Sequence, residues 1–97
     1  MARYVSLINW TDKGIKDYKD TVARASAANG LAAKFGGRIE SIWWTIGPYD
    51  LVSVLDFADE ESATAFALAL GSVGNVRTTT MRAFDADAMA AIVAKTG

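Results

Sequence analysis

The side chains best suited to bind a ligand or assist a reaction are aromatic or cationic, and they fall in segments expected to be strands or turns. An indole ring can stack on a planar ligand, a phenol can donate a proton, and a guanidinium can hold a carboxylate or phosphate through two hydrogen bonds. The residues concerned are Trp10, Trp43, Trp44, Tyr49, Arg77 and Arg82. These residue types favour a surface that binds a small, partly aromatic metabolite.

Histidine and cysteine are both absent from the 97-residue sequence. Histidine is the usual general base and the commonest metal ligand, and cysteine supplies thiolate nucleophiles, metal ligands and disulfides. The acidic residues Asp12, Asp59, Asp85 and Asp87 are expected at helix caps or in first helical turns, which argues against a metal cluster. We therefore predict neither a metal site nor a cofactor.

Length and charge restrict the class of protein further. Residues 1–97 suffice for one domain with a single modest core. The chain carries 10 lysines and arginines against 11 aspartates and glutamates, and this balance disfavours a nucleic-acid-binding surface. We see no stretch of about 20 apolar residues that could cross a membrane and no secretory signal. A cytoplasmic protein is the expectation.

Hydrophobic periodicity divides the chain into four strands and three helical segments in the order β-α-β-β-α-β-α. The strands are predicted at residues 3–10, 38–46, 51–57 and 76–84, and the helices follow caps at Thr11, Asp59 and Asp85. The first helical segment is expected to break near residues 20–21 and to end at Gly36-Gly37. This order predicts an α+β, ferredoxin-like fold: a four-stranded antiparallel sheet with both main helices on one face, and an extra C-terminal helix.

Alternation within the strands predicts which residues face the helices. Val5 and Leu7, together with Val52 and Val54, are all aliphatic and are placed beneath the helices, and Met81 is placed there too. The open face would then carry the mixed aromatic, aliphatic and hydroxyl set: Tyr4, Ser6, Ile8, Trp10, Ser41, Trp43, Thr45, Leu51, Ser53, Leu55, Thr78, Thr80 and Arg82. A register slip of one residue would reverse the assignment for the last strand.

An open face of this composition is a large apolar patch for a monomer. We expect it to be covered by a second copy, with the two sheets packed face to face about a two-fold axis. The predicted assembly is a homodimer or a higher even homo-oligomer. Serine and threonine hydroxyls would make the interface partly polar.

The predicted ligand-binding residues are drawn from this face and from the turn that joins the second and third strands. They are Trp10, Trp43, Thr45, Tyr49, Asp50, Thr80 and Arg82. Each has a structural alternative: the Gly47–Asp50 segment is favoured as a plain hairpin turn, and the tryptophans can equally pack in a dimer core. For Arg82, an ion pair with Asp50, with Asp56 or with an acidic residue of a second copy is favoured over anion binding.

Three segments also carry a resemblance to a known family. They are residues 3–12 (RYVSLINWTD), 43–50 (WWTIGPYD) and 74–84 (GNVRTTTMRAF). Together they resemble the GYD domain family, which takes its name from a Gly-x-Tyr-Asp turn, here Gly47, Tyr49 and Asp50. The resemblance implies a ferredoxin-like domain of the dimeric α+β barrel type, mainly bacterial, without an established activity.

Three functions fit these observations. The first is a dimeric domain that binds a small metabolite between sheet and helices. The second, by analogy with related barrels, is a cofactor-independent monooxygenase or isomerase acting on a small aromatic substrate. In that case Trp10 or Trp43 would stack the substrate, Tyr49 would donate a proton and Arg82 would stabilise an oxyanion. The third is a structural protein whose only role is to oligomerise.

Overall fold

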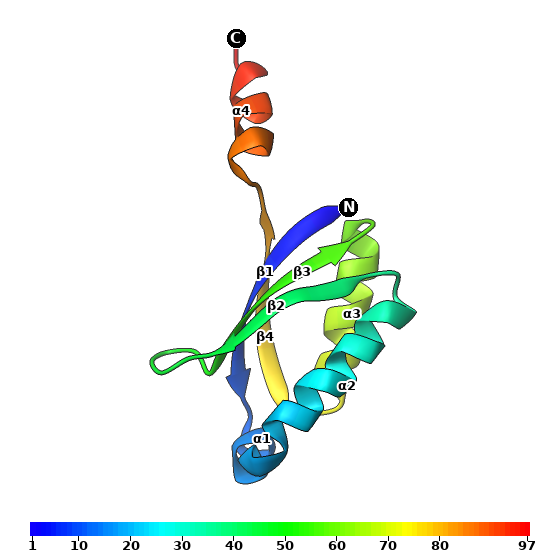
Figure 1. The fold of residues 1–97 in the computed structure, drawn as a ribbon, viewed down its shortest axis with the longest axis vertical. Coiled ribbons are helices and arrows are strands. Elements are labelled where there is room, and N and C mark those ends of the chain that lie inside the picture. The colour runs from blue at the N-terminus through cyan, green and yellow to red at the C-terminus, as the bar shows by residue number, and fades with distance from the viewer.

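The computed structural model describes residues 1–97 and forms one sheet with helices on one side of it (Figure 1). The elements in chain order are β1 (Ala2–Trp10), α1 (Asp12–Lys16), a 3₁₀ turn η1 (Tyr18–Asp20), α2 (Thr21–Lys34), β2 (Arg38–Trp44), β3 (Leu51–Phe57), α3 (Glu60–Ser72), β4 (Val76–Ala83) and α4 (Ala86–Ala94). The strand order is β2-β3-β1-β4, and all neighbouring pairs are antiparallel. The predicted ferredoxin-like fold with an additional C-terminal helix is confirmed.

The predicted helix caps are all present. The side chains of Thr11, Asp59 and Asp85 accept hydrogen bonds from backbone N–H groups three residues ahead, at 3.1, 2.8 and 2.8 Å. The expected break in the first helical segment is also present, because α1 ends at Lys16 and α2 begins only after η1. The caps begin α1, α3 and α4, whereas α2 starts at the break without a side-chain capping bond from Asp20.

Gly14 in α1 lies where the backbone of α1 closely approaches the backbone of Asn75. A Cβ atom at this position would lie 1.9 Å from the carbonyl oxygen of Asn75, the residue just before β4. The backbone N–H of Thr11 donates to the same oxygen at 3.1 Å. Glycine therefore allows α1 to sit directly against the α3–β4 connection, so the ends of β1 and β4 are tied together.

The faces of three strands are the reverse of the prediction. Residues on the helix-covered face pair with one another across the strands: Tyr4, Ser6 and Ile8 of β1, Leu51, Ser53 and Leu55 of β3, and Thr78, Thr80 and Arg82 of β4. The open face carries Val5, Leu7, Val52, Val54, Thr79 and Met81. The β2 assignment alone is confirmed, since Ser41 and Trp43 pair with open-face valines.

The error has a physical cause. The prediction assumed that an all-aliphatic set must belong beneath the helices, yet both faces of this sheet are rich in apolar side chains. Ser6 and Ser53 lie opposite each other on the covered face, and the Ser6 hydroxyl is 3.2 Å from that of Thr80. A buried serine whose hydroxyl hydrogen-bonds to a neighbouring side chain does not need solvent, so serine does not mark an exposed face.

One end of the covered face holds the tightest core. Tyr4, Leu55 and Phe57 of the sheet pack against Ala32 of α2 and against α3, whose contributions are Ala63 and Phe66. The rings of Phe57 and Phe66 have centroids 5.2 Å apart. Small Ala32, fully buried, lets α2 approach this aromatic cluster closely.

The C-terminal helix stands apart from this core. Figure 1 shows α4 projecting beyond the sheet, past the end of β4. None of its residues is buried, and Met89 and Val93 are 49% and 55% exposed. An alanine-rich helix with an apolar stripe thus has no partner within its own chain. No helix in the molecule has the length and apolar character required to span a membrane.

Candidate functional site

A cleft separates α2 from the sheet at the end away from the aromatic cluster. Its volume is about 510 Å³. The residues lining it are Ile8, Trp10, Thr21, Arg24, Ala25, Ala27, Ala28, Gly30, Leu31, Lys34, Ile42, Leu51, Leu70, Val73, Asn75 and Val76. They come from α2, all four strands and the end of α3, so the cleft lies between sheet and helices.

The size of the side chains on α2 explains why the cleft is open. The face of α2 toward the sheet carries Thr21, Arg24, Ala28 and Leu31, at intervals of three and four residues that bring them onto one side of the helix. Ala28 contributes only a methyl group where a larger residue would fill the space to Ile8 and Ile42. The open space therefore follows from a small residue at an inward position.

A narrow continuation of the cleft, about 30 Å³, leads toward hydroxyl groups on the sheet. It shares Ile8, Ala28, Ile42 and Leu70 with the main cleft. Its polar lining consists of the hydroxyl residues Ser6, Ser53, Thr78 and Thr80. A ligand in the cleft would therefore meet apolar walls and, at depth, groups that can donate or accept hydrogen bonds.

The charged lining of the cleft is purely cationic. Arg24 and Lys34 are its only charged residues, and neither forms an ion pair. One guanidinium nitrogen of Arg24 donates to the backbone carbonyl of Gly14 at 3.0 Å. This bond anchors the side chain beside α1 while its other N–H groups remain available.

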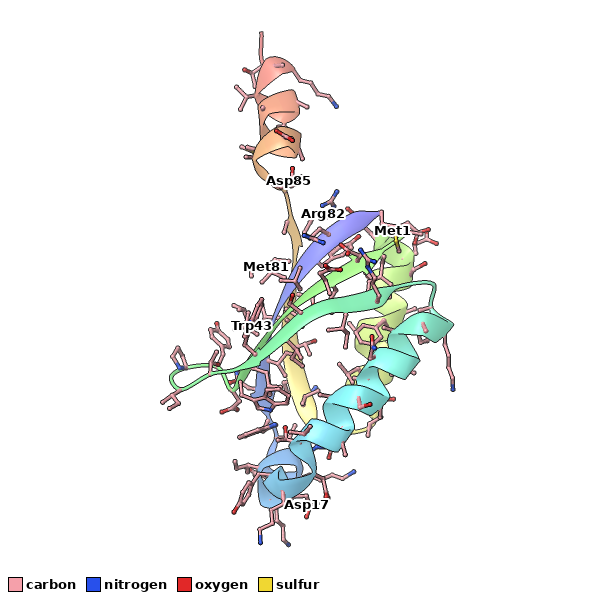
Figure 2. The ribbon with its side chains drawn as sticks, viewed as in Figure 1. Met1, Asp17, Trp43, Met81, Arg82 and Asp85 are labelled. Carbon is pink, nitrogen blue, oxygen red and sulfur yellow. The ribbon has the colours of Figure 1, made fainter.

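The predicted site residues do not form one site. Trp10 lines the main cleft and Thr80 lines its continuation. Trp43 lies on the open face with 54% of its surface exposed, and Figure 2 shows it well separated from Arg82 along the sheet. The sheet itself therefore lies between Trp43 and the cleft.

The Gly-x-Tyr-Asp segment behaves as a structural turn. The Asp50 carboxylate accepts a hydrogen bond from the backbone N–H of Trp10 at 2.8 Å, and the Asp50 backbone N–H donates to the carbonyl of Ile8 at 2.9 Å. The Thr45 hydroxyl donates to the carbonyl of Tyr49 at 2.6 Å. Thr45 and Asp50 therefore have structural roles: Thr45 stabilises the β2–β3 hairpin, and Asp50 attaches the hairpin to β1.

Arg82 lies at the opposite end of the sheet from the cleft. Its guanidinium is 5.7 Å from the centroid of the Tyr4 ring and 4.5 Å from that of Phe84, and it donates to the carbonyl of Arg3 at 3.1 Å. The ion pairs considered for it with Asp50 and Asp56 are not formed. Within the chain, its guanidinium contacts two aromatic rings and donates to the backbone carbonyls of Arg3 and Ala83.

The Tyr4 hydroxyl is a buried group without a hydrogen-bond partner. Burial raises the pKa of the Tyr4 phenol, and the negative charge of Glu60 adds to this effect. The neutral phenol is therefore the form present near neutral pH. An unpaired buried hydroxyl carries a free-energy cost, which makes Tyr4 a weak point of an otherwise well-packed end.

Arg3, Arg38 and Asp56 form an ion cluster across three strands on the open face, at the same end of the sheet as Tyr4. Asp56 is 5% exposed and accepts hydrogen bonds from Arg3 at 3.0 and 3.1 Å and from Arg38 at 3.2 Å. Hydrogen bonding from Arg3 lowers the pKa of the Asp56 carboxyl, and Arg38 lowers it further. Because each charge is paired, this cluster has a structural role.

Sequence reasoning missed most of the cleft. Arg24, Ala28 and Asn75 were not among the predicted site residues, although Asn75 carries an unpaired side-chain amide in the cleft lining. The available signal was the spacing Thr21–Arg24–Ala28, which places a hydroxyl, a cation and a small residue on one helix face. An inward alanine beside an inward arginine indicates space that a packed core would not leave.

Comparisons with known proteins agree with this fold. A relative from Thermus thermophilus, described as a glutamine synthetase and cystathionine beta-lyase binding protein, is 31% identical over 84 residues, covering 86% of this chain and 88% of its own. A crystal structure of a protein from the same organism matches with a TM-score of 0.57 at 25% identity, over 89% of this chain and 96% of that one.

A third protein, from Thermobifida fusca, is described as a dimeric ferredoxin-like protein of unknown function; it matches with a TM-score of 0.40 at 15% identity, over 84% of this chain and 90% of its own. The sequence model of the GYD domain covers residues 4–93, which is almost the whole chain. The chain therefore belongs to the GYD domain family, of the dimeric α+β barrel type.

Proposed function

We propose that this protein binds a small metabolite in the cleft between α2 and the sheet. The observation that carries the proposal is an apolar space of about 510 Å³, bordered by a few polar groups and not filled by the chain's own side chains. Binding sites in proteins typically combine apolar walls with a small number of convergent polar groups. The family itself has no established activity.

Binding is favoured over catalysis because the candidate catalytic residues are dispersed. Trp10 borders the cleft, whereas Tyr49 belongs to the hairpin turn and Arg82 stacks on Tyr4 at the far end of the sheet. A reaction on one substrate requires its reacting groups within hydrogen-bond reach of each other. The monooxygenase or isomerase alternative therefore lacks the constellation assigned to it.

A thermal-shift screen of apolar metabolites tests the proposal. The variant Ala28→Leu places a larger side chain in the cleft, and Ala33→Leu makes the same change on the exposed side of α2 as a matched control. A ligand of the cleft should raise the melting temperature of the wild type and of Ala33→Leu but not of Ala28→Leu. Equal stabilisation of all three proteins would place binding elsewhere and contradict the proposal.

We also propose that the protein acts as a homodimer, or a higher even homo-oligomer, joined through the open face. Val5, Leu7, Val52 and Val54 form an aliphatic strip there, flanked by Trp43 and Met81, which are 54% and 44% exposed. Both this strip and the apolar stripe of α4 lack a partner within the chain. Burying them together favours association through the hydrophobic effect.

Light scattering coupled to size-exclusion chromatography tests this assembly. Leu7→Lys introduces a charge at the centre of the open face, and Thr79→Lys, which pairs with Leu7 at its edge, is a milder companion. We expect an even multiple of the monomer mass, twice or more, for the wild type and the monomer mass for Leu7→Lys. A monomeric wild type at micromolar concentration would contradict the proposal.

A second candidate function is docking onto an enzyme. The relative from Thermus thermophilus is described as binding glutamine synthetase and cystathionine beta-lyase, and the likeness covers most of both chains. The exposed apolar side chain of Ile46 at the β2–β3 hairpin would suit such a contact. Calorimetric titration with each purified enzyme tests it. Loss of binding in Ile46→Ser, with the oligomeric state unchanged, would support it, and no binding by the wild type would contradict it.

A further inference from the structure

We propose that the ligand of the cleft is an anion, a carboxylate joined to an elongated apolar body, with its carboxylate at Arg24. This inference rests on the proposed function and specifies the class of molecule bound. The lining contains two cations and no aspartate or glutamate, although acidic residues slightly outnumber basic ones in the chain. A cationic bias confined to an apolar cleft selects for an anionic ligand.

Three residues that can donate hydrogen bonds, Arg24, Thr21 and Asn75, line this part of the cleft. The guanidinium uses one nitrogen on the Gly14 carbonyl and keeps others for a ligand. The Thr21 hydroxyl, about one turn earlier, accepts a hydrogen bond from the Trp44 indole at 2.9 Å, so its own hydrogen is free to donate. The Asn75 amide forms no side-chain hydrogen bond, and its backbone lies directly against Gly14.

This geometry matches a carboxylate better than a neutral group. An arginine anchored by one backbone bond presents its remaining N–H groups in a fixed direction, and guanidinium–carboxylate bonds are stronger than neutral hydrogen bonds. The half-buried position of Arg24 reduces solvent screening relative to a surface arginine. The structure therefore assigns the polar head of the ligand to this end.

The rest of the cleft indicates the length and the apolar character of the ligand's body. From Arg24 to Leu31 the helix advances by about 10 Å at roughly 1.5 Å per residue. Along this length the walls are aliphatic, supplied mainly by Ile8, Ile42 and Leu70. An extended chain of about eight carbons spans that distance, so medium-chain fatty acids and arylalkyl carboxylates fit the site.

Three probes of equal length separate charge from apolar contact: octanoate, octan-1-ol and octylamine, titrated into the intact protein by isothermal calorimetry. We expect octanoate to bind about 10-fold more tightly than octan-1-ol, and octylamine to bind most weakly. Added salt should weaken octanoate binding and leave octan-1-ol binding nearly unchanged.

Substitutions of the two cations in the lining test which of them binds the carboxylate. Arg24→Gln should remove the preference for octanoate over octan-1-ol, and Arg24→Lys should keep part of it. Lys34→Gln removes the other cation of the lining, about 15 Å away along α2, and should keep the preference. Because Arg24 also holds α1, melting temperatures of the variants are measured alongside, and the wild-type salt dependence tests the charge without any substitution.

The possible results separate failure of the carboxylate assignment from failure of the proposed metabolite binding in the cleft. Equal affinity for octanoate and octan-1-ol, or a preference abolished by Lys34→Gln and kept by Arg24→Gln, would overturn the assignment of the carboxylate to Arg24 and leave binding in the cleft intact. If neither octanoate nor octan-1-ol binds, and the metabolite screen finds no ligand sensitive to Ala28→Leu, the proposed function fails as well.

Discussion

The two ends of the layer between sheet and helices are built from the same elements but are packed in opposite ways. At one end, the rings of Phe57 and Phe66 pack closely against each other beside fully buried Ala32. At the other end, Ala28 faces Ile8 across a cleft of about 510 Å³. One turn of α2 separates a closed core from an open site.

This contrast suggests a division of roles along α2: the aromatic cluster positions the helix at one end, and the other end borders the cleft. The aromatic cluster holds α2 and α3 against the sheet, while the caps and Gly14 fix the start of α1 against the α3–β4 connection. With both ends held, α2 does not need to collapse onto the sheet over Ala28. A small inward residue then yields a cleft instead of a closer helix.

The largest expected effect is damage to the closed end. Phe66→Ala should lower the free energy of unfolding by about 3–5 kcal/mol, because a ring that is 2% exposed leaves a cavity. Leu70→Ala, one turn later at the wall of the cleft, should cost clearly less, about 1–2 kcal/mol, because its surroundings are already open. Chemical denaturation measures both, and similar losses would contradict the contrast.

The sharpest comparison uses the same substitution at both ends. Ala32→Leu forces extra atoms into a filled core and should cost about 1–3 kcal/mol. Ala28→Leu, four residues earlier on the same helix, should be neutral or stabilising because its side chain enters the cleft. Equal destabilisation of the two variants would mean that the cleft is not available space.

A smaller effect is expected on the open face. The pKa of Asp56 is lowered in the folded protein, so its contribution to stability is present above the unfolded value of about 4 and is lost as pH falls through the folded value. Asp56→Asn should cost about 1 kcal/mol at pH 7, since both arginines are largely exposed and screened.

Unfolding curves at pH 7 and pH 3 measure this loss. The difference between wild type and Asp56→Asn should shrink at pH 3, and high salt should reduce it at pH 7. A difference that grows on acidification would contradict the sign of the pKa shift.

The smallest effect concerns the unpaired hydroxyl at the closed end. Tyr4→Phe removes an oxygen that is buried without a hydrogen-bond partner, and should stabilise the protein by up to about 1 kcal/mol. Thermal unfolding measures the change. A loss of more than about 1 kcal/mol would show that the hydroxyl has a partner, such as a bound water.

The sequence was sufficient for the elements, their order and the caps at Thr11, Asp59 and Asp85, because these depend on local periodicity and on single side chains. It was not sufficient for the faces of the sheet. Alternation identifies two faces, but with aliphatic residues on both, only the helices' own contacts decide which face they cover. Serine at position 6 suggested exposure and is in fact buried beside Thr80.

The candidate site was recovered only in part for the same reason. Trp10 and Thr80 were predicted, and both border the cleft or its continuation. Trp43 was placed on the correct face of the sheet, but that face is not the one with the cleft. Arg24 and Asn75 come together only through the close approach of α1 to the α3–β4 connection, a tertiary contact that no local pattern reveals.

The most direct test of the central claim is an NMR titration of the isotope-labelled protein with octan-1-ol and with octanoate, mapping which backbone amides shift. We predict that the shifts concentrate in α2 around residues 25–31 and in β1 near Ile8, and that Ala28→Leu abolishes them. Shifts confined to the open face around Val5 and Leu7, or unchanged binding in Ala28→Leu, would contradict the account.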